Sequence, residues 1–206
     1  YLWVGTQNGL NRFDGYQFSV FLYNPDDSVS ISNNWIYAIA EDKNGDLWIG
    51  TKQGLNRYNR KRDNFQRIPH SSNYGGLISY CVYDVIVAST GIIYLNTTPT
   101  LTVIDPERKT IRHYPTNFPS DGVIEDNKIP LLEDSEGDIW VGNNNGLTCF
   151  HPPDGRISYF PGTGTVNSLT SDKITALGQA RASNIWLGTM AGIYLLENIH
   201  GNTTPM

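Results

Sequence analysis

The chain has 206 residues, of which 39% are hydrophobic and 12% aromatic, and it contains 20 glycines. These values are typical of a globular, β-rich domain with a hydrophobic core of its own. The net charge of −5 and the absence of a basic run argue against nucleic acid as a partner, and the absence of a long apolar segment argues against direct membrane insertion.

A short stretch occurs five times along the chain. LWVGTQNGLNRF, near the start, recurs as LWIGTKQGLNRY, IYLNTTPTLTVI, IWVGNNNGLTCF and IWLGTMAGIYLL. The aromatic residues of these stretches lie 45 or 46 residues apart, at Trp3, Trp48, Tyr94, Trp140 and Trp186. A fixed period of this length indicates a repeat architecture.

The second repeat shows the expected elements most clearly. It contains four short runs rich in β-branched and aromatic residues, each bounded by turn residues, at 35–42, 46–51, 54–59 and 64–69. Between the first two runs, Asn44-Gly45 is typical of a tight hairpin turn with positive φ at both residues. Gly54 suits a second turn, because glycine takes a left-handed conformation at little cost. Four strands joined by hairpins predict one antiparallel sheet per repeat.

Alternate residues of the LWIG run point to opposite faces of its strand. Leu47 and Ile49 share one face, and Trp48 and Gly50 share the other, so both faces are apolar or small and both are expected to be buried. Because one sheet cannot cover its own two faces, we expect sheets stacked around an axis, with the glycine making room for the neighbouring sheet. The residues with this structural role in the repeats are Trp3, Gly5, Gly9, Trp48, Gly50, Gly54, Tyr94, Trp140, Gly142, Gly146, Trp186, Gly188 and Gly192.

The sequence therefore predicts an all-β fold, a β-propeller fragment with about four and a half four-stranded antiparallel blades. The expected segment 1–206 consists of a partial blade at 1–32, blades at 33–78, 79–124 and 125–170, and a partial blade at 171–206. The blade at 79–124 is degenerate, because Asn96 and Thr100 replace its two glycines. Open blade faces and strand edges at both ends predict self-association.

The loops that enter each blade and those between its second and third strands share one face of a propeller. Amides and aromatic rings on such a face suit a neutral or acidic glycan. We interpret any single asparagine or aspartate as an ordinary turn former and predict binding only for the face as a whole. Trp35 is the most informative single candidate. Cys81, Lys128 and Lys173 occupy its position in other repeats, so the repeat fold itself does not require a large aromatic residue there. The candidate ligand-binding residues are Asn33, Asn34, Trp35, Lys52, Gln53, Asn127, Lys128, Asn143, Asn144, Asn145, Asp172 and Lys173.

No combination of residues predicts catalysis, a metal site or a cofactor. Glu41-Asp42 and Glu133-Asp134 are adjacent on strands and point to opposite faces, so we interpret them as solvated turn acids. DSEGDIW, at 134–140, is close to the Asp-box of sialidases but differs from it by one residue in spacing. The histidines are scattered and have no metal-ligand spacing.

The stretch NGDLWIGTKQGLNRYN at 44–59, preceded by DDSVSISNNWIYAIAED at 26–42, closely resembles the two-component regulator propeller repeat. The preceding stretch is similar to the linker of that family, which reads Asp-Pro-x-Ser-Leu-Ser followed by asparagine and an apolar strand. A weaker copy of the linker is TVNSLTSDKITAL at 165–177. The resemblance covers essentially the whole chain, and only the third repeat departs from it.

The resemblance implies a non-enzymatic sensor segment in the periplasmic part of a hybrid two-component signalling protein. The parent chain would carry the remaining propeller blades and a histidine kinase, and the ligand would be an oligosaccharide. One alternative is a purely structural or dimerisation scaffold, with the ligand bound elsewhere. A lyase or glycosidase-type propeller enzyme is a less favoured alternative, because it needs a histidine and a metal-binding acid on the channel face.

Overall fold

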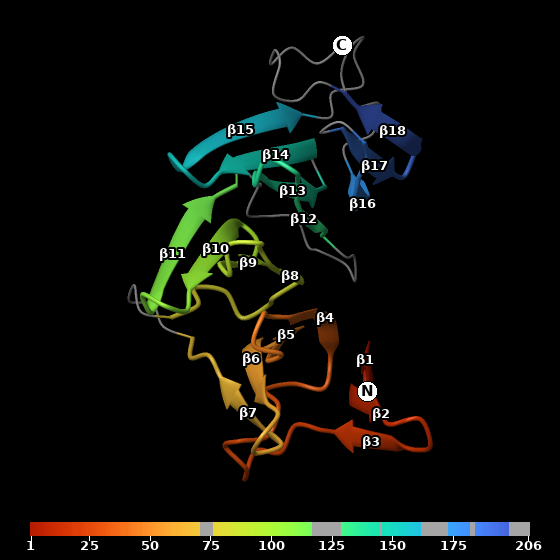
Figure 1. Cartoon of the computed structure of the whole chain (residues 1–206), viewed down its shortest axis with the longest axis vertical. Coiled ribbons are helices and arrows are strands. Elements are labelled where there is room, and N and C mark those ends of the chain that lie inside the picture. The colour runs from red at the N-terminus through yellow and green to blue at the C-terminus, as the bar shows by residue number, and fades with distance from the viewer. Residues whose placement is uncertain (71–75, 117–128, 145, 162–172, 182–183, 198–206) are drawn as a thin grey trace. The chain divides into compact units, whose positions relative to one another are not determined.

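The computed structural model describes residues 1–206 apart from 71–75, 117–128, 145, 162–172, 182–183 and 198–206 (Figure 1). All regular elements of the described residues are β-strands, and they form five sheets. The chain divides into two compact units, the first comprising Tyr1–Thr98 with Thr102–Tyr114, and the second Pro99–Leu101 with Pro115–Met206. The predicted all-β fold of repeated antiparallel sheets is confirmed.

The sheets are meanders, in which strands lie in chain order (Figure 1). Sheet 1 contains β1 (Leu2–Thr6), β2 (Gly9–Phe13) and β3 (Phe18–Phe21). Sheet 2 contains β4 (Ile36–Glu41), β5 (Leu47–Thr51), β6 (Gly54–Asn59) and β7 (Asn64–Arg67). Sheet 3 contains β8 (Asp84–Val87), β9 (Ile93–Asn96), β10 (Thr100–Asp105) and β11 (Thr110–Pro115).

Two further sheets lie in the C-terminal part of the chain (Figure 1). Sheet 4 contains β12 (Leu131–Glu133), β13 (Ile139–Asn143), β14 (Gly146–His151) and β15 (Arg156–Pro161). Sheet 5 contains β16 (Ile174–Gln179), β17 (Ile185–Thr189) and β18 (Gly192–Leu196). Each sheet falls within one of the five predicted blade ranges, and the limits of those ranges stay a prediction.

The turn between β4 and β5 differs from the predicted two-residue hairpin. Gly45 N–H donates to the Asp42 carbonyl at 2.9 Å, and Asp42 N–H donates to the Asp46 carbonyl at 2.9 Å. Gly45 has a φ of 80°, whereas Asn44 is not among the residues with positive φ. The prediction of positive φ at both residues is therefore wrong, because the loop is a wider turn that needs the left-handed conformation only at its glycine.

A buried carboxylate holds the equivalent turn in sheet 4. Asp134 Oδ1 accepts hydrogen bonds from the backbone N–H of Glu136 at 2.9 Å and of Asp138 at 3.0 Å. Its Oδ2 accepts one from the indole Nε1 of Trp140 at 2.7 Å. Asp134 is only 6% exposed, so its interpretation as a solvated turn acid is wrong. We call this arrangement the carboxylate clamp.

Sheet 2 has the same carboxylate clamp. Asp42 Oδ1 accepts from the N–H of Asn44 at 2.9 Å and of Asp46 at 3.0 Å, and its Oδ2 accepts from Trp48 Nε1 at 3.0 Å. The half-buried Asp42 is therefore also not a freely solvated acid, whereas its neighbour Glu41 is exposed. The clamp aspartate lies six residues before the tryptophan in both sheets.

The glycine two residues after the aromatic residue faces the beginning of the next sheet. A Cβ added to Gly50 would lie 2.8 Å from the backbone oxygen of Val82, which precedes β8. Such a distance is too short for a side chain, so only glycine permits this approach. Two other sheet pairs show the same contact with a β-branched side chain at 2.7 Å, Ile36 over Gly5 and Ile174 over Gly142.

The aromatic residue of the repeat is buried in three of the five sheets. Trp48 and Tyr94 are each 3% exposed and Trp140 is 1% exposed. Trp186 of sheet 5 is 48% exposed, and within the described residues no sheet covers its face. The burial of Trp48 and Trp140 therefore follows from contact with the next sheet and not from the single sheet.

Hydrogen bonds and an ion pair made by Arg12 join sheet 1 to sheet 2. Arg12 Nη1 donates to the hydroxyl of Tyr58 at 2.8 Å and to Asp63 Oδ1 at 2.9 Å, and Tyr58 itself donates to Asp63. The Arg12 guanidinium also lies over the Trp3 ring, 5.7 Å from its centroid. Burial and the hydrogen bond to Asp63 raise the pKa of Tyr58 to about 12. The hydrogen bonds from Tyr58 and Arg12 lower the pKa of Asp63.

We predict that the Tyr58 hydroxyl makes folding sensitive to alkaline pH. Because folding raises the pKa of Tyr58 from 10.0 to about 12, its stabilising contribution is complete below pH 10 and is lost as the pH rises through about 12. The free energy of unfolding of wild type, relative to Tyr58→Phe, should fall over this window by at most about 1.4 kcal/mol per pH unit. Urea unfolding at pH 9, 10 and 11 measures the difference, and parallel curves for the two proteins would contradict the prediction.

Candidate functional site

The predicted ligand-binding residues Trp35 and Lys52 lie together in the first unit. Trp35 precedes β4, and Lys52 lies in the turn between β5 and β6. Lys52 N–H donates to the Trp35 carbonyl at 3.1 Å, and Lys52 Nζ lies 5.0 Å from the centroid of the indole. This is a cation–π contact, and it leaves the exposed ammonium group beside a half-buried aromatic ring.

Two tyrosines lie beside this pair, and a β-bulge places the first of them. The pairing of β4 with β5 shifts register between Ile36 and Ala38, so Tyr37 is the extra residue of the bulge. Bulges redirect side chains, and the Tyr37 ring lies 6.2 Å from the Trp35 ring and 5.2 Å from the Tyr83 ring. We refer to Trp35, Tyr37, Lys52 and Tyr83 as the Trp35 cluster.

The Trp35 cluster is aromatic and carries one positive charge. Burial raises the pKa of Tyr83 well above its usual range, and the neighbouring Cys81 and Tyr37 act in the same direction. Its phenol is therefore neutral at physiological pH and can both donate and accept a hydrogen bond. Lys52 is the only charged side chain among the four. Such a set can stack against a ring and bind hydroxyl or carboxylate groups.

The asparagines predicted beside Trp35 build the loop that carries it. Asn33 Oδ1 accepts a hydrogen bond from Trp35 N–H at 2.8 Å, which is a local turn. Asn34 Oδ1 accepts one from Tyr23 N–H at 2.7 Å, and the Asn34 carbonyl accepts one from Gly9 N–H at 2.7 Å. Gln53 is exposed next to Lys52. The side-chain oxygens of the two asparagines thus position the loop that carries Trp35.

The remaining predicted residues belong to the second unit. Asn144 and Lys173 are half-buried, and Asn143 is 1% exposed and therefore inside the sheet. Four predicted residues lie outside the described part of the chain, namely Asn127, Lys128, Asn145 and Asp172. Of the predicted set, the structure brings Trp35, Lys52 and the neighbouring Asn33, Asn34 and Gln53 together, and ligand binding by any of them stays a prediction.

Sequence reasoning missed Tyr37 and Tyr83. Strand alternation gave no valid signal for Tyr37, because Trp35 precedes β4 and Tyr37 is the extra residue of the bulge. Tyr83 had no local signal, since it comes from the linker that precedes β8 and reaches Tyr37 only after sheets 2 and 3 have packed.

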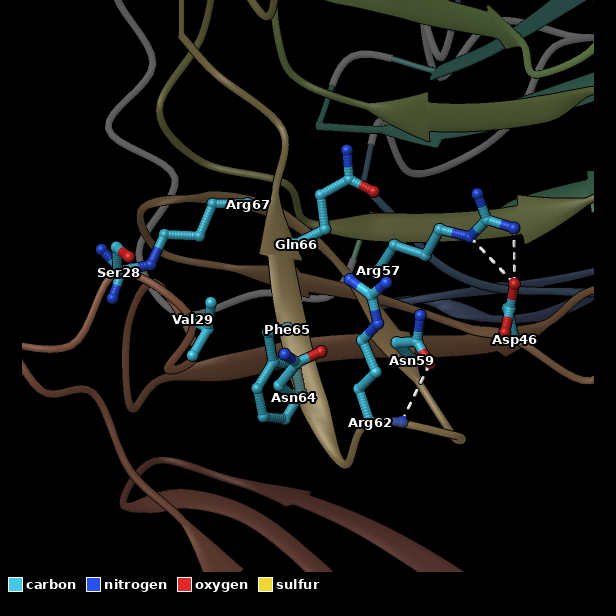
Figure 2. Close-up of a pocket in the computed structure, with 10 residues that line it drawn as sticks. All are labelled: Ser28, Val29, Asp46, Arg57, Asn59, Arg62, Asn64, Phe65, Gln66 and Arg67. Carbon is cyan, nitrogen blue, oxygen red and sulfur yellow. Dashed lines mark hydrogen bonds and ion pairs between the residues drawn. The ribbon is translucent and has the colours of Figure 1, made fainter.

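A hollow of about 620 Å³ lies along the outer strand β7, and Figure 2 shows the residues that line it. Two of its arginines have structural partners. Arg57 Nε donates to Asp46 Oδ2 at 3.0 Å, and Arg67 extends the other way, where its Nε donates to the Ser30 carbonyl at 2.9 Å (Figure 2). We therefore regard this hollow as part of the scaffold and prefer the Trp35 cluster as the candidate site.

The described residues contain no group of three His, Cys, Asp or Glu side chains placed to bind a metal ion. Within the same residues, no helix is long and apolar enough to cross a membrane.

Comparison with known proteins identifies the repeat. The family described as two component regulator propeller matches residues 30–53, which run from the linker through the tryptophan strand to the β5–β6 turn. A histidine kinase P4 of Formosa agariphila is 61% identical over 31 residues, which are 15% of this chain and 2% of that protein. The predicted resemblance to this repeat family is confirmed.

Solved structures extend the likeness to nearly the whole chain. The extracellular domain of a B. thetaiotaomicron protein described as a hybrid two component system matches 94% of this chain, with 27% identity and a TM-score of 0.74. A second such domain from B. thetaiotaomicron has 24% identity and a TM-score of 0.73. This chain spans 25% of each of those structures. Virginiamycin B lyase from Staphylococcus aureus shares the fold at 15% identity, with a TM-score of 0.69 and coverage of 97% of this chain and 61% of the lyase.

Proposed function

We propose that this chain, whose repeats are similar to those of two component regulator propellers, is a ligand-recognition segment of an extracytoplasmic sensor in a hybrid two-component signalling protein. The observation that carries the proposal is the likeness over 94% of the chain to an extracellular domain described as part of such a system. On this proposal the segment lies in the periplasm, has no catalytic activity of its own, and is joined to further propeller blades and a histidine kinase in the parent chain.

The proposed ligand is an oligosaccharide bound at the Trp35 cluster. The apolar face of a pyranose ring stacks well on an indole, and Trp35 is half-buried and backed by Tyr37. Lys52, exposed above the indole, can bind a hydroxyl or a carboxylate of the sugar. Binding would alter kinase output only if the ligand had a higher affinity for one arrangement of the sensor than for another.

Trp35→Ala tests the site directly. We expect this variant to bind the best oligosaccharide of a panel at least about fivefold more weakly than wild type, because stacking on an aromatic ring contributes about 1 kcal/mol or more. Isothermal titration calorimetry with neutral and acidic oligosaccharides provides the affinities. The matched control is Tyr16→Ala, which removes an aromatic ring that is 97% exposed in the β2–β3 turn. Equal affinities for wild type and Trp35→Ala would remove the Trp35 cluster from consideration.

Lys52→Gln distinguishes the charge class of the ligand. The substitution removes the ammonium group but keeps a polar side chain over the indole. A large loss of affinity confined to acidic oligosaccharides would indicate a salt bridge from Lys52 to the ligand. A small loss of affinity for all oligosaccharides would indicate that Lys52 contributes only a hydrogen bond.

A structural or dimerisation scaffold, with the ligand bound elsewhere, is the second candidate. If no oligosaccharide binds the folded chain, this candidate replaces the first. A lyase-type activity has only the shared fold in its favour, and calorimetric titration with magnesium tests it.

A further inference from the structure

One arginine of the hollow along β7 is not explained by the scaffold. The hydrogen bonds of Arg57 and Arg67 account for those two side chains, whereas Arg62 lies in the exposed turn between β6 and β7. Figure 2 shows the Arg62 side chain extending from this turn into the hollow that it lines. Within the described residues its guanidinium group donates no hydrogen bond and forms no ion pair. Its charge is therefore open to a ligand.

The β10–β11 turn of sheet 3 has the same backbone geometry as the β6–β7 turn. Asn59 Oδ1 accepts hydrogen bonds from the backbone N–H groups two and three residues later, at 3.0 and 3.1 Å. Asp105 Oδ1 accepts from the corresponding N–H groups of its own turn, at 3.0 Å each. Both turns then use a positive φ four residues after their first residue, 50° at Asp63 and 55° at Lys109. The two turns can therefore be compared residue by residue.

The two turns differ in the counter-charge of their arginine. The third residue after the first is Arg62 in one turn and Arg108 in the other. Arg108 Nη1 donates to Asp105 Oδ2 at 3.2 Å, which is an ion pair within the turn. Asn59 takes the place of that aspartate in sheet 2, so the turn is preserved but the carboxylate is missing. The unpaired guanidinium group is thus a property of sheet 2 that the turn itself does not require.

The hollow beside Arg62 carries an excess of positive charge. Three of its ten lining residues are arginines and one, Asp46, is a carboxylate, although the whole chain has a net charge of −5. That carboxylate accepts from Arg57. Arg67 donates only to carbonyl and hydroxyl oxygens, which do not neutralise its charge. The hollow therefore attracts anions more strongly than the rest of this acidic chain does.

Amide groups beside Arg62 add hydrogen-bond donors. Asn59 pairs with Asn64 across β6 and β7, and both side chains line the hollow. The Oδ1 atom of Asn59 is used in the turn, and its NH₂ group remains as a donor. A guanidinium group binds a carboxylate or sulfate through two parallel N–H···O bonds, and amide NH₂ groups can satisfy the other oxygens. The hollow is also larger than one anion needs, since small-molecule sites measure about 300–1,000 Å³.

We propose that the hollow along β7 binds an acidic sugar, whose carboxylate or sulfate group is held by the Arg62 guanidinium. The amides of Asn59 and Asn64 donate to the same group, and the other polar side chains of the hollow meet the sugar hydroxyls. The lining of this site contains no residue of the Trp35 cluster. The two sites are therefore independent, and either can bind a ligand without the other.

Three variants test the site by the backbone amide NMR shifts of residues 59–67, in titrations with sodium galacturonate at constant ionic strength. Arg62→Gln should weaken binding at least about tenfold, because it removes a charge-assisted hydrogen bond. Asn59→Asp should weaken it by a similar factor, because it supplies Arg62 with the carboxylate that Asp105 supplies in sheet 3. The control is Lys61→Gln, which removes the same charge from an exposed neighbour that does not line the hollow. Its affinity should stay within about twofold of wild type.

The choice of probes separates specific binding from general attraction to the basic turn. Galactose, the neutral counterpart, should cause no saturable shift, and glucose 6-sulfate should bind as galacturonate does. The proposal is overturned if neither acidic sugar gives a saturable shift, if acetate binds as tightly as galacturonate, or if Lys61→Gln loses as much affinity as Arg62→Gln. The indole N–H signal of Trp35 reports the other site in the same titrations, so failure at one site is distinguishable from failure at the other.

Discussion

Gly50→Val should separate sheet 3 from sheet 2 and lower the free energy of unfolding of the first unit by about 1–3 kcal/mol. Even the Cβ of the new side chain would lie 2.8 Å from the Val82 carbonyl oxygen and 2.9 Å from Val82 Cγ1. The backbone cannot retreat locally, because Val82 N–H donates to the Thr51 carbonyl at 3.0 Å and thereby fixes the two sheets together. Relief of the clash therefore requires the sheets to move apart and to expose part of the core around Trp48.

Urea unfolding followed by tryptophan fluorescence measures this loss. The matched control is Gly178→Ala in β16, where the nearest heavy atom to the added Cβ is 3.9 Å away. The control should change the free energy of unfolding by less than about 1 kcal/mol, because it adds one methyl group in open space. Equal unfolding curves for Gly50→Val and wild type would show that the sheets are not held by close approach at Gly50.

The role of Gly50 illustrates what the sequence could predict. The alternation of the LWIG run placed Trp48 and Gly50 on one face, and the repeat period required that this face be covered by another sheet. Both inferences use only strand geometry and the spacing of residues along the chain. Both predictions are therefore correct for the fold, although neither used any contact between residues far apart in the sequence.

The carboxylate clamp was not predicted, for a physical reason. In a strand Glu41 and Asp42 point to opposite faces, and this correctly excludes a convergent catalytic pair. Whether the Asp42 carboxylate is hydrogen-bonded to water or to the indole N–H of Trp48 depends on the conformation of the turn from Asp42 to Asp46. The alternation of side chains along a strand does not predict that conformation. A signal was nevertheless present, since Asp42 and Asp134 both lie six residues before a tryptophan.

Sheets 3 and 5 have no carboxylate clamp, because each lacks an aspartate six residues before a buried tryptophan. Ala88 lies six residues before Tyr94, whose ring has no N–H to donate. Ala180 lies six residues before Trp186, which is the exposed tryptophan of sheet 5. The aspartate and the buried indole therefore occur together in sheets 2 and 4, and neither sheet 3 nor sheet 5 has both.

The candidate site was predictable only where it depends on loop position. Trp35 and Lys52 were predicted because loops of the two kinds share a face in a propeller, and they do contact each other. Tyr37 reaches the site through a bulge, whose position depends on the register of β4 with β5. Register and packing between sheets are properties of the folded chain, and no single residue pattern encodes them.

Asp134→Ala should lower the free energy of unfolding of the second unit by about 3 kcal/mol or more. The substitution removes three acceptor contacts at once and leaves the N–H groups of Glu136 and Asp138 and the indole of Trp140 without the clamp carboxylate. A buried donor that loses its acceptor costs about 1–3 kcal/mol, and Trp140 is 1% exposed, so water cannot replace the carboxylate without opening the core. Asp134→Asn should have an intermediate effect, because one amide oxygen can still accept from the backbone while its NH₂ group faces another donor.

The control for the clamp is Asp154→Ala, which removes an exposed turn aspartate that accepts from Arg156 N–H at 2.9 Å. Because water can replace that acceptor, the control should cost less than about 1 kcal/mol. Chemical denaturation of the three variants and wild type, followed by tryptophan fluorescence, ranks their stabilities. If Asp134→Ala were no less stable than Asp154→Ala, the carboxylate would not be what holds Trp140 and the β12–β13 turn, and the correlation of aspartate with buried indole across the repeats would need another cause.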